Sequence, residues 1–235
     1  MAILELKDIC KDYIQGKEPV HVLKHIDLTV EQGDYLAIMG PSGSGKTTLM
    51  NIIGCLDLPT SGSYTLNGEN LQDLSDDALA EIRNKYIGFV FQGFYLLPKM
   101  NALDNVALPL LYAGVGVKER RERAAAALEA VGLGERMNFL PNQLSGGQCQ
   151  RVAIARAMVG NPTLLLADEP TGALDTKAGN QIMDILRHLS DQGMTILMIT
   201  HEPAIAACAD KTYHILDGEL RTSAEPEGGA DHAEA

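Results

Sequence analysis

The positions of apolar and polar residues alternate along this chain between short strand-like runs and longer helical patterns. Three short runs are almost wholly apolar, which is typical of parallel strands buried on both faces; they cover residues 35–39, 163–167 and 195–200. Three other runs alternate beside turn signals, which favours a partly exposed antiparallel layer; they cover residues 3–6, 20–30 and 63–66. The pattern predicts an α/β fold with a mainly parallel core sheet and an antiparallel β layer.

Helical periodicity fills most of the sequence between these runs. We expect helices over residues 45–55, 76–83, 117–131, 145–159 and 176–191. Between about residues 93 and 160 the strand signals disappear, which predicts a helical lobe inserted between two strands of the sheet. Within it, the charged run 118–130 is typical of a solvated helix face with ion pairs four residues apart. Residues 1–222 are expected to form one domain. Residues 223–235 are rich in Pro, Gly, Ala and acids, which predicts a disordered acidic tail.

Composition and charge narrow the classes of function. The 235 residues carry 19 Lys and Arg against 31 Asp and Glu, for a net charge of −12. This charge disfavours an electrostatic hold on nucleic acid or on an anionic membrane. No run supplies the roughly 20 apolar residues of a membrane-spanning helix, and the first residues lack a secretory signal, so we expect a cytosolic chain. The four cysteines form no CxxC pair and have no His at ligand spacing, so neither disulfides nor a zinc site are predicted.

The segment GPSGSGKT, residues 40–47, follows an apolar run and opens a helical one. Glycines there allow a tight turn that brings backbone N–H groups onto phosphate oxygens, beside the positive end of a helix dipole. The spacing predicts a nucleotide-phosphate loop in which Lys46 reaches the β- and γ-phosphates and the Thr47 hydroxyl binds Mg²⁺. The predicted loop contacts are Gly40, Pro41, Ser42, Gly43, Ser44, Gly45, Lys46, Thr47 and Thr48. The alternative is a Gly/Ser-rich turn that contains a lysine by chance.

Polar residues also end two other apolar runs. Asp168 and Glu169 follow the second of them, and His201 follows the third. Because parallel strands open on one carboxyl edge, where ligands bind, these side chains are expected to meet the phosphate loop. Asp168 would hold Mg²⁺, directly or through water, Glu169 would face an attacking water, and His201 would reach the γ-phosphate. The alternatives are acids placed where the chain leaves the core, and a structural histidine.

The segment LSGGQ, residues 144–148, precedes an amphipathic run. Ser145 and Gln148 fit the capping box S-x-x-Q, and the two glycines leave the helix start open. This is a second helix N-terminus suited to an anion. It would be redundant for a nucleotide that already has a phosphate loop, unless it serves the nucleotide of a partner. The alternative is a well-capped helix and no more.

Together these motifs resemble the ATP-binding cassette (ABC) ATPases over residues 1 to about 222, with LSGGQ as the family signature. Other family positions follow in order: Tyr13 as the aromatic that stacks on adenine, Gln92 of the Q-loop, and Asp175 of the D-loop. For Tyr13 an ordinary strand-end tyrosine is the alternative. The resemblance implies catalytic roles for Glu169, His201 and Lys46, and Mg²⁺ contacts by Thr47, Gln92 and Asp168. It adds nucleotide contacts by Tyr13, Gln92, Ser145, Gly146, Gly147, Gln148, Asp168 and Asp175.

The resemblance also implies a mode of action. Two copies would pair head to tail around two ATP molecules with Mg²⁺, and ATP-driven closure would act on a separate membrane permease. Residues 52–64, 89–98 and 166–177 resemble a subfamily of macrolide and antimicrobial-peptide exporters and lipoprotein-release ATPases. A cassette of that kind lies peripherally on the cytoplasmic face of the inner membrane, and an extracytoplasmic adaptor can join through the permease.

Two other function classes are weighed against export. One is mechanotransmission or sensing, with a membrane partner that transports nothing. The other is a soluble ABC protein of DNA repair or translation, which the acidic charge and the single short cassette disfavour.

Two local features leave alternatives open. The apolar and aromatic stretch 93–98, after Gln92, is interpreted either as a surface groove for a short permease helix or as packing inside the helical lobe. Cys149 follows the signature, where a polar residue is usual in the family. It either makes the shared site sensitive to thiol reagents or is a small neutral residue on a helix.

Overall fold

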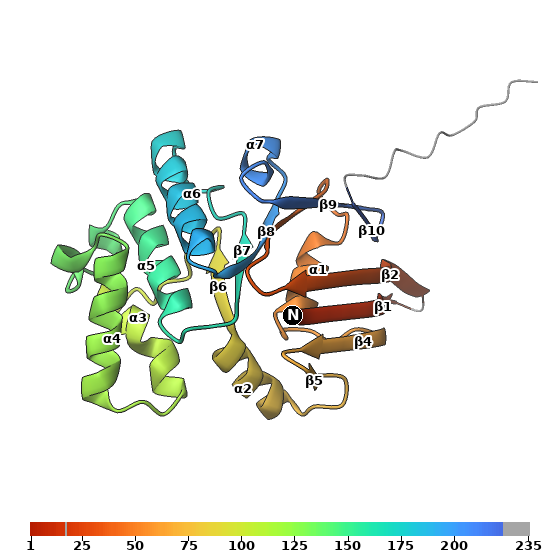
Figure 1. The fold of residues 1–235 in the computed structure, drawn as a ribbon, viewed down its shortest axis with the longest axis horizontal. Helices are drawn as coiled ribbons and strands as arrows, with labels where there is room; N and C mark the ends of the chain where they lie inside the picture. Colours follow the sequence, from red (N-terminus) through yellow and green to blue (C-terminus); the bar gives the residue numbers. More distant parts are fainter. Residues whose placement is uncertain (17, 223–235) are drawn as a thin grey trace, which may run out of the picture.

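The computed structural model describes residues 1–16 and 18–222 (Figure 1). The acidic tail predicted over residues 223–235 lies outside the described residues. A six-stranded sheet with the order β10-β9-β3-β8-β7-β6 forms the centre of the molecule, and only its β9 and β10 pair antiparallel. Its strands are β3 (Tyr35–Met39), β6 (Ile87–Phe91), β7 (Leu164–Asp168), β8 (Thr195–Thr200), β9 (Lys211–Leu216) and β10 (Glu219–Thr222).

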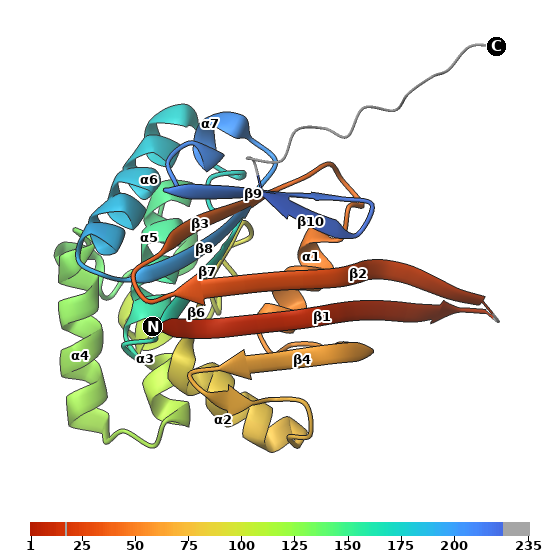
Figure 2. The ribbon, with the colours of Figure 1, turned by 45° about the vertical axis from the view of Figure 1, so that its right-hand side comes forward.

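A second, antiparallel sheet with the order β2-β1-β4-β5 lies beside the first (Figure 2). Its strands are β1 (Ala2–Gln15), β2 (Glu18–Glu31), β4 (Ser61–Leu66) and β5 (Glu69–Asn70). In the last part of β2, residues 26–31 alternate between buried and exposed, as expected for a sheet with one face toward a core and one toward water. The predicted combination of a mainly parallel sheet with an antiparallel layer is confirmed.

The helices cover both faces of the central sheet. Helix α1 packs between the two sheets, while α3 to α6 pack on the opposite face of the central sheet. In Figure 1, α3, α4 and α5 form a group to one side of the sheets. The helices are α1 (Lys46–Ile53), α2 (Asp76–Tyr86), α3 (Ala102–Tyr112), α4 (Val117–Ala130), α5 (Gly146–Met158), α6 (Thr176–Asp191) and α7 (Pro203–Ala206), with 3₁₀ turns at Gly134–Arg136 and Pro141–Gln143.

The central strands contribute side chains to two hydrophobic cores because successive side chains of a strand point to opposite faces. In β3, Leu36 and Ile38 enter the core shared with α1 and the antiparallel sheet. Tyr35 and Ala37 enter the core shared with α3 to α6. The alternation repeats in β7 and β8, which explains why these runs are apolar at nearly every position. The predicted burial of these strands on both faces is confirmed.

Several elements differ from the sequence prediction, each for a physical reason. β1 continues far beyond residues 3–6, and β9 and β10 were not expected, because most side chains in these stretches are exposed or partly exposed. β6 was not expected because it contains Gly88, where a Cβ would lie 2.4 Å from the carbonyl oxygen of Ala157 in α5. α3 contains Pro109, which interrupts a helical pattern.

Among the described residues, none of the helices has the length and apolar character required to cross a bilayer.

Candidate functional site

Three neighbouring parallel strands end together at one edge of the central sheet. Met39 at the end of β3 pairs with Thr200 at the end of β8, and Asp168 at the end of β7 pairs with Ile199. The loop after Met39, the acid after Asp168 and the histidine after Thr200 therefore leave the sheet side by side. The structure thus brings the predicted phosphate loop, Glu169 and His201 to the same edge.

The glycines of the phosphate loop are required by its backbone. Gly43 and Gly45 have φ values of 81° and 107°, which favour glycine. At Gly40 a Cβ would lie 2.3 Å from the carbonyl oxygen of Ile215 in β9. The lysine that follows folds back over this loop, where the Lys46 Nζ donates hydrogen bonds of 2.7 Å to the carbonyl oxygens of Gly40 and Pro41. The ammonium group is therefore held at the mouth of the loop.

The start of α1 fits an anionic ligand. Its N-cap is Gly45, which offers no side-chain cap, and its first turn contains no acidic residue. The first backbone N–H groups of the helix are therefore left for another partner. The Ser44 Oγ is also buried without a hydrogen-bond partner. Free amides, an unpaired buried hydroxyl and an ammonium group at one loop fit nucleotide phosphates.

Glu169 and His201 form a hydrogen-bonded pair at this edge. The His201 Nδ1 lies 2.6 Å from the Glu169 Oε1, and the His201 backbone N–H donates to the same oxygen over 3.0 Å. The Thr200 hydroxyl donates to the other carboxylate oxygen over 3.2 Å. The hydrogen bond and the negative charge of Glu169 raise the pKa of His201. Glu169 itself has φ 45°, a left-handed conformation that is rare outside glycine.

Asp168 lies in a different electrostatic environment. Burial raises the pKa of its carboxyl group, the charge of Glu169 raises it further, and Lys46 lowers it. Two adjacent carboxylates with one nearby ammonium group leave excess negative charge, which a divalent cation would balance. Thr47 is exposed in the first turn of α1. A hydroxyl and a carboxylate are oxygen donors of the kind that Mg²⁺ prefers.

Gln92 follows β6 and packs against the loop after Glu169. A Cβ at Gly172 would lie 2.7 Å from the Gln92 Nε2, so glycine makes room for this side chain. The buried Gln150 in α5 donates to the carbonyl oxygens of Phe91 and Pro170 over 3.2 and 2.7 Å. Gln150 thereby ties the residue before Gln92 to the loop after Glu169.

The turn after Gln92 is held from the same helix. Phe94 and Tyr95 both have left-handed φ values, 58° and 45°. The Arg156 guanidinium in α5 donates hydrogen bonds of 2.7 Å to the carbonyl oxygens of both residues. Burial lowers the pKa of Arg156. Sequence reasoning missed Gln150 and Arg156, for which the available signal was two long polar side chains within a buried amphipathic helix.

The start of α5 carries the predicted capping box. The Gln148 N–H donates to the Ser145 Oγ over 3.3 Å, and the Ser145 N–H donates to the Gln148 Oε1 over 2.9 Å. Gly147 faces Ala178 of α6, where a Cβ would come within 3.0 Å of the Ala178 Cβ. Asp175 accepts a hydrogen bond from the Ala178 N–H over 2.8 Å, so it caps α6. No hydrogen bond within the described chain joins residues 145–148 to the phosphate loop.

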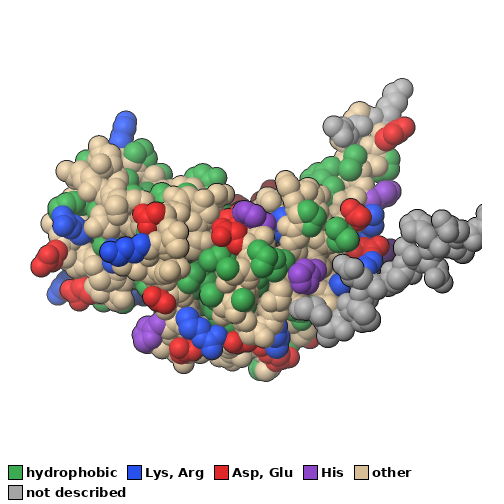
Figure 3. Space-filling view, turned by 90° about the horizontal axis from the view of Figure 1, so that it is seen from above, with side chains coloured by type: hydrophobic (Ala, Val, Ile, Leu, Met, Phe, Trp, Pro, Cys, Tyr) green, Lys and Arg blue, Asp and Glu red, His purple; other side chains and the backbone are tan. Residues whose placement is uncertain are grey.

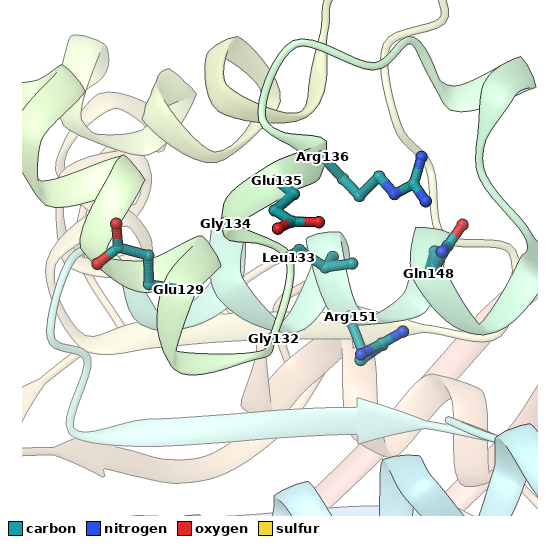
Figure 4. Close-up of a pocket in the computed structure, with 8 residues that line it drawn as sticks. All are labelled: Glu129, Gly132, Leu133, Gly134, Glu135, Arg136, Gln148 and Arg151. Carbon is teal, nitrogen blue, oxygen red and sulfur yellow. The ribbon is translucent and has the colours of Figure 1, made fainter.

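A hollow of about 340 Å³ lies beside this helix start (Figure 4). Acidic and basic side chains both line it, with Glu129 and Glu135 beside Arg136 and Arg151. Its residues are Glu129, Gly132, Leu133, Gly134, Glu135, Arg136, Gln148 and Arg151. The phosphate loop contributes nothing to this hollow, so it is separate from the edge described above.

Tyr13 lies on β1 with 41% of its surface exposed. Its hydroxyl donates to the Asp57 Oδ2 over 2.7 Å. The Lys11 Nζ forms a 2.6 Å ion pair with Asp57 and lies 4.9 Å from the centre of the Tyr13 ring. The ring is therefore anchored at its hydroxyl end. Whether it stacks on adenine stays a prediction.

Charge is mixed over the surface. On the face shown in Figure 3, Lys and Arg side chains are scattered among Asp and Glu rather than gathered in one patch. This distribution agrees with the net charge of −12 in disfavouring a nucleic-acid surface on this face.

The cysteines are expected to differ in reactivity. Cys149 is 7% exposed, its thiol donates to the Pro141 carbonyl oxygen over 3.5 Å, and burial raises its pKa. Of the two interpretations of Cys149, the structure favours the small neutral residue.

With metals removed, iodoacetamide should modify the partly exposed Cys10 and Cys208 at least about tenfold faster than Cys149, because the thiolate is the reactive form. Mass spectrometry of each cysteine peptide measures this, and equal rates would contradict the assignment.

Comparison with known proteins agrees with this geometry. The family model described as ABC transporter matches residues 23–172. The chain is 61% identical to the ABC transporter ATP-binding protein YvrO of Bacillus subtilis (strain 168), over 93% of this chain and 95% of that protein. It is 52% identical to the macrolide export ATP-binding/permease protein MacB of Syntrophobacter fumaroxidans, over 98% of this chain but only 32% of that protein.

The structural comparison gives the same result. The dimeric structure of the ATP-binding cassette MJ0796 in a post-hydrolysis state, bound to ADP and Pi, superposes with a TM-score of 0.85. That match covers 93% of this chain and 98% of that chain, at 44% sequence identity. The resemblance noted from the motifs is therefore confirmed. A family match over more than half of the sequence, joined to near-full-length identity with cassette proteins, shows that this chain belongs to the ABC transporter family as an ATP-binding ATPase.

Proposed function

We propose that this chain is the ATP-hydrolysing subunit of an ABC export complex of the antimicrobial-peptide, macrolide or lipoprotein type. The observation that carries the proposal is the register of β3, β8 and β7, which places the phosphate loop, Glu169 and His201 at one edge. The similarity to the MacB macrolide exporter supports export as the direction of transport. In this proposal the chain lies peripherally on the cytoplasmic face of the membrane, held there by a separate permease.

The residues at the edge divide the chemistry of ATP hydrolysis. Bound Mg²⁺ would neutralise charge that develops on the phosphate oxygens, and Thr47, Gln92 and Asp168 are the residues that would hold it. Lys46 exchanges the carbonyl oxygens of its own loop for phosphate oxygens. Glu169 orients a water molecule and accepts its proton. Such hydrolysis depends mainly on positioning and electrostatic stabilisation, which the loop amides supply.

The hydrogen bond between Glu169 and His201 describes a resting arrangement. The Glu169 Oε1 accepts from both the ring and the backbone N–H of His201. A water molecule that donates its proton to this oxygen needs that acceptor position. We infer that the His201 ring turns from Glu169 toward the γ-phosphate when ATP binds, while the backbone N–H and the Thr200 hydroxyl keep the carboxylate in place.

The second anion site implies a dimer. Residues 145–148 make no hydrogen bond to the phosphate loop of their own chain, although their helix start is open to an anion. In the proposed head-to-tail homodimer, Ser145, Gly146 and Gly147 contact the ATP held by the other copy. The γ-phosphate then contributes contacts that exist only in the closed state, which is the condition for ATP to drive closure. MJ0796, a structural relative, forms a dimer.

The exposure of Tyr95 and Leu97 favours the permease groove, while Leu96 between them packs against the core of the helical lobe. Tyr95 and Leu97 have 69% and 42% of their surfaces exposed. Their backbone is nevertheless fixed, because the buried Asn105 accepts from the Leu97 N–H over 2.8 Å and donates to the Leu97 carbonyl oxygen. Apolar side chains presented to water on a fixed backbone are suited to bind a short amphipathic helix.

Changing Tyr95 or Leu97 to Asp should abolish binding of the permease. A buried carboxylate without a partner is costly in an apolar interface, so retention of the co-expressed permease on the tagged cassette should fall at least about tenfold. Basal ATP hydrolysis by the isolated cassette should stay near that of the unmodified protein. Tyr112→Asp is the matched control, because this tyrosine is 75% exposed on α3. Unchanged retention with both groove variants would refute the groove.

Reconstitution tests the direction and the cargo. Cassette and permease in lipid vesicles should move a macrolide or a cationic peptide outward from the cassette side, and the Glu169→Gln variant should not. If the pair hydrolyses ATP and moves neither class, while a membrane or envelope partner changes activity with each ATP cycle, export is overturned in favour of mechanotransmission.

A further inference from the structure

Three side chains that commonly bind metals meet on the outer face of the antiparallel sheet, away from the ATP machinery. Asp8 and Cys10 lie on β1 and His25 lies on β2 (Figure 2). Ile9 between Asp8 and Cys10 is fully buried in the core, whereas Asp8 is exposed and Cys10 is partly exposed. The side chains of Asp8 and Cys10 therefore lie on the water-facing side of the sheet.

An irregularity in strand pairing brings the histidine to them. The register of β1 with β2 shifts between the Leu6↔Leu28, Ile9↔Ile26 and Lys11↔Leu23 pairs. Such a bulge bends a strand and changes the direction of a side chain. The backbone at Asp8 and His25 takes left-handed φ values of 53° and 49°. This local geometry places the His25 ring between Asp8 and Cys10.

The distances describe a compact set of donors. The His25 Nδ1 lies 2.6 Å from the Asp8 Oδ1 and 3.8 Å from the Cys10 Sγ. The three candidate ligand atoms all lie within 4.8 Å of one another. The side chains of His25 and Asp8 are 76% and 70% exposed, so an ion can reach them from water. The Asp8 backbone is also fixed, since its N–H donates to the Asp27 Oδ1 over 2.8 Å.

We propose that Asp8, Cys10 and His25 bind a Zn²⁺ ion, with water as the fourth ligand. Thiolate, imidazole and carboxylate are the donors that zinc takes, and a thiolate disfavours Mg²⁺ and Ca²⁺. Ligand bonds of about 2.0–2.3 Å in a tetrahedron separate donor atoms by roughly 3.4 Å. The aspartate–histidine pair must therefore open by somewhat less than 1 Å, and the Cys10 Sγ must approach the His25 Nδ1 by less than that. Binding replaces the thiol proton, which passes to solvent.

The consequence of such an ion is local. It would join β1 to β2 at the point where their hydrogen-bond ladder is irregular. Spacing along the sequence did not predict this site, since Cys10 and His25 are separated by a turn between strands and by a register shift that only the structure shows. None of the three residues belongs to the proposed ATP machinery, so the zinc proposal and the proposed function can fail independently.

Cobalt absorption tests the proposal on the whole chain. Added to the metal-free protein, Co²⁺ should produce a thiolate-to-cobalt charge-transfer band, and equimolar Zn²⁺ should remove it. Cys10→Ser should abolish the band, and His25→Asn or Asp8→Asn should weaken Co²⁺ binding at least about tenfold. Cys208→Ser should leave it unchanged. His21→Asn should also leave the band unchanged. This variant breaks the similar His21–Asp12 pair on the same strands, which belongs to no group of three candidate metal ligands among the described residues.

Protection from alkylation gives a second readout. Zn²⁺ should slow the reaction of Cys10 with iodoacetamide at least about tenfold and leave Cys208 unaffected. Thermal unfolding of each variant without metal should match that of the unmodified protein, because Asp8 and His25 are largely exposed and Cys10 is partly exposed. Absence of the band in the unmodified protein, its persistence in Cys10→Ser, or equal protection of both cysteines would overturn the site.

Discussion

Replacing Glu169 by Gln should lower the turnover number of ATP hydrolysis about 10³-fold while ATP binding persists. The amide oxygen can still accept the hydrogen bond from the His201 backbone N–H, and the amide NH₂ group can donate to the Thr200 hydroxyl, which donates to the carboxylate now. The amide cannot accept a proton from water. The change therefore removes the proposed base and keeps the shape of the site. Loss of one negative charge beside Asp168 should also leave the affinity for MgATP equal or higher.

Steady-state phosphate release and equilibrium binding of a fluorescent ATP analogue measure the two effects separately. Glu202→Gln is the matched control, because it removes the same negative charge from an exposed acid next to His201 whose carboxylate lies within 4.8 Å of the Glu169 and His201 ligand atoms. It should stay within about twofold of the unmodified protein. The same Glu169→Gln protein with MgATP should dimerise, alone or with its membrane subunit. Hydrolysis retained in this variant would remove Glu169 from the role of base.

Mixing two inactive variants should restore ATP hydrolysis if each nucleotide is shared by two chains. Lys46→Ala disables the phosphate loop, and Ser145→Arg fills the open helix start with a large cation. In a mixed head-to-tail dimer, one site carries both defects and the other carries none. Random pairing of equal amounts makes half of the dimers mixed, so activity should recover to about a quarter of the unmodified level.

A second mixture is the control for this experiment. Lys46 and Glu169 both belong to the edge of their own chain, so a dimer of Lys46→Ala with Glu169→Gln has one defect in each site. No recovery is expected there. Recovery in both mixtures, or in neither, would contradict the shared site. Loss of the Ser145 cap costs about 1 kcal/mol, so the thermal stability of that variant needs checking first.

The sequence predicted the centre of the fold better than its periphery. β3, β7 and β8 are buried on both faces, and nearly unbroken apolar runs follow directly from that burial. β9 has one fully buried residue, Ile215, and its outer positions give no apolar signal. The strand pattern of β6 is interrupted in the sequence by Gly88, which the tight packing of this strand against α5 requires. The positions of these peripheral strands thus depend on hydrogen bonding to neighbouring strands, which the local sequence does not encode.

The candidate site divides in the same way. Its motifs are contiguous because a phosphate loop, a strand end and a helix cap are local structures, and the sequence displays them directly. The contacts between motifs were not visible. The bond from Gln150 to the residue before Gln92, and the bond between Glu169 and His201, join segments far apart in the chain. Only the packing of α5 and β8 against their neighbours creates them.

The hydrogen bonds from Arg156 to the turn after Gln92 connect helix α5 to that turn, so that the two should move together. One end of the helix carries Ser145, the proposed contact to the partner's ATP, and Arg156 grips the Phe94 and Tyr95 carbonyls about 16 Å further along. A tilt at the nucleotide end must therefore displace the aromatic side chain offered to the permease. The nucleotide state and the position of the permease would then be coupled through helix α5, and the Arg156 guanidinium would make the connection to the turn.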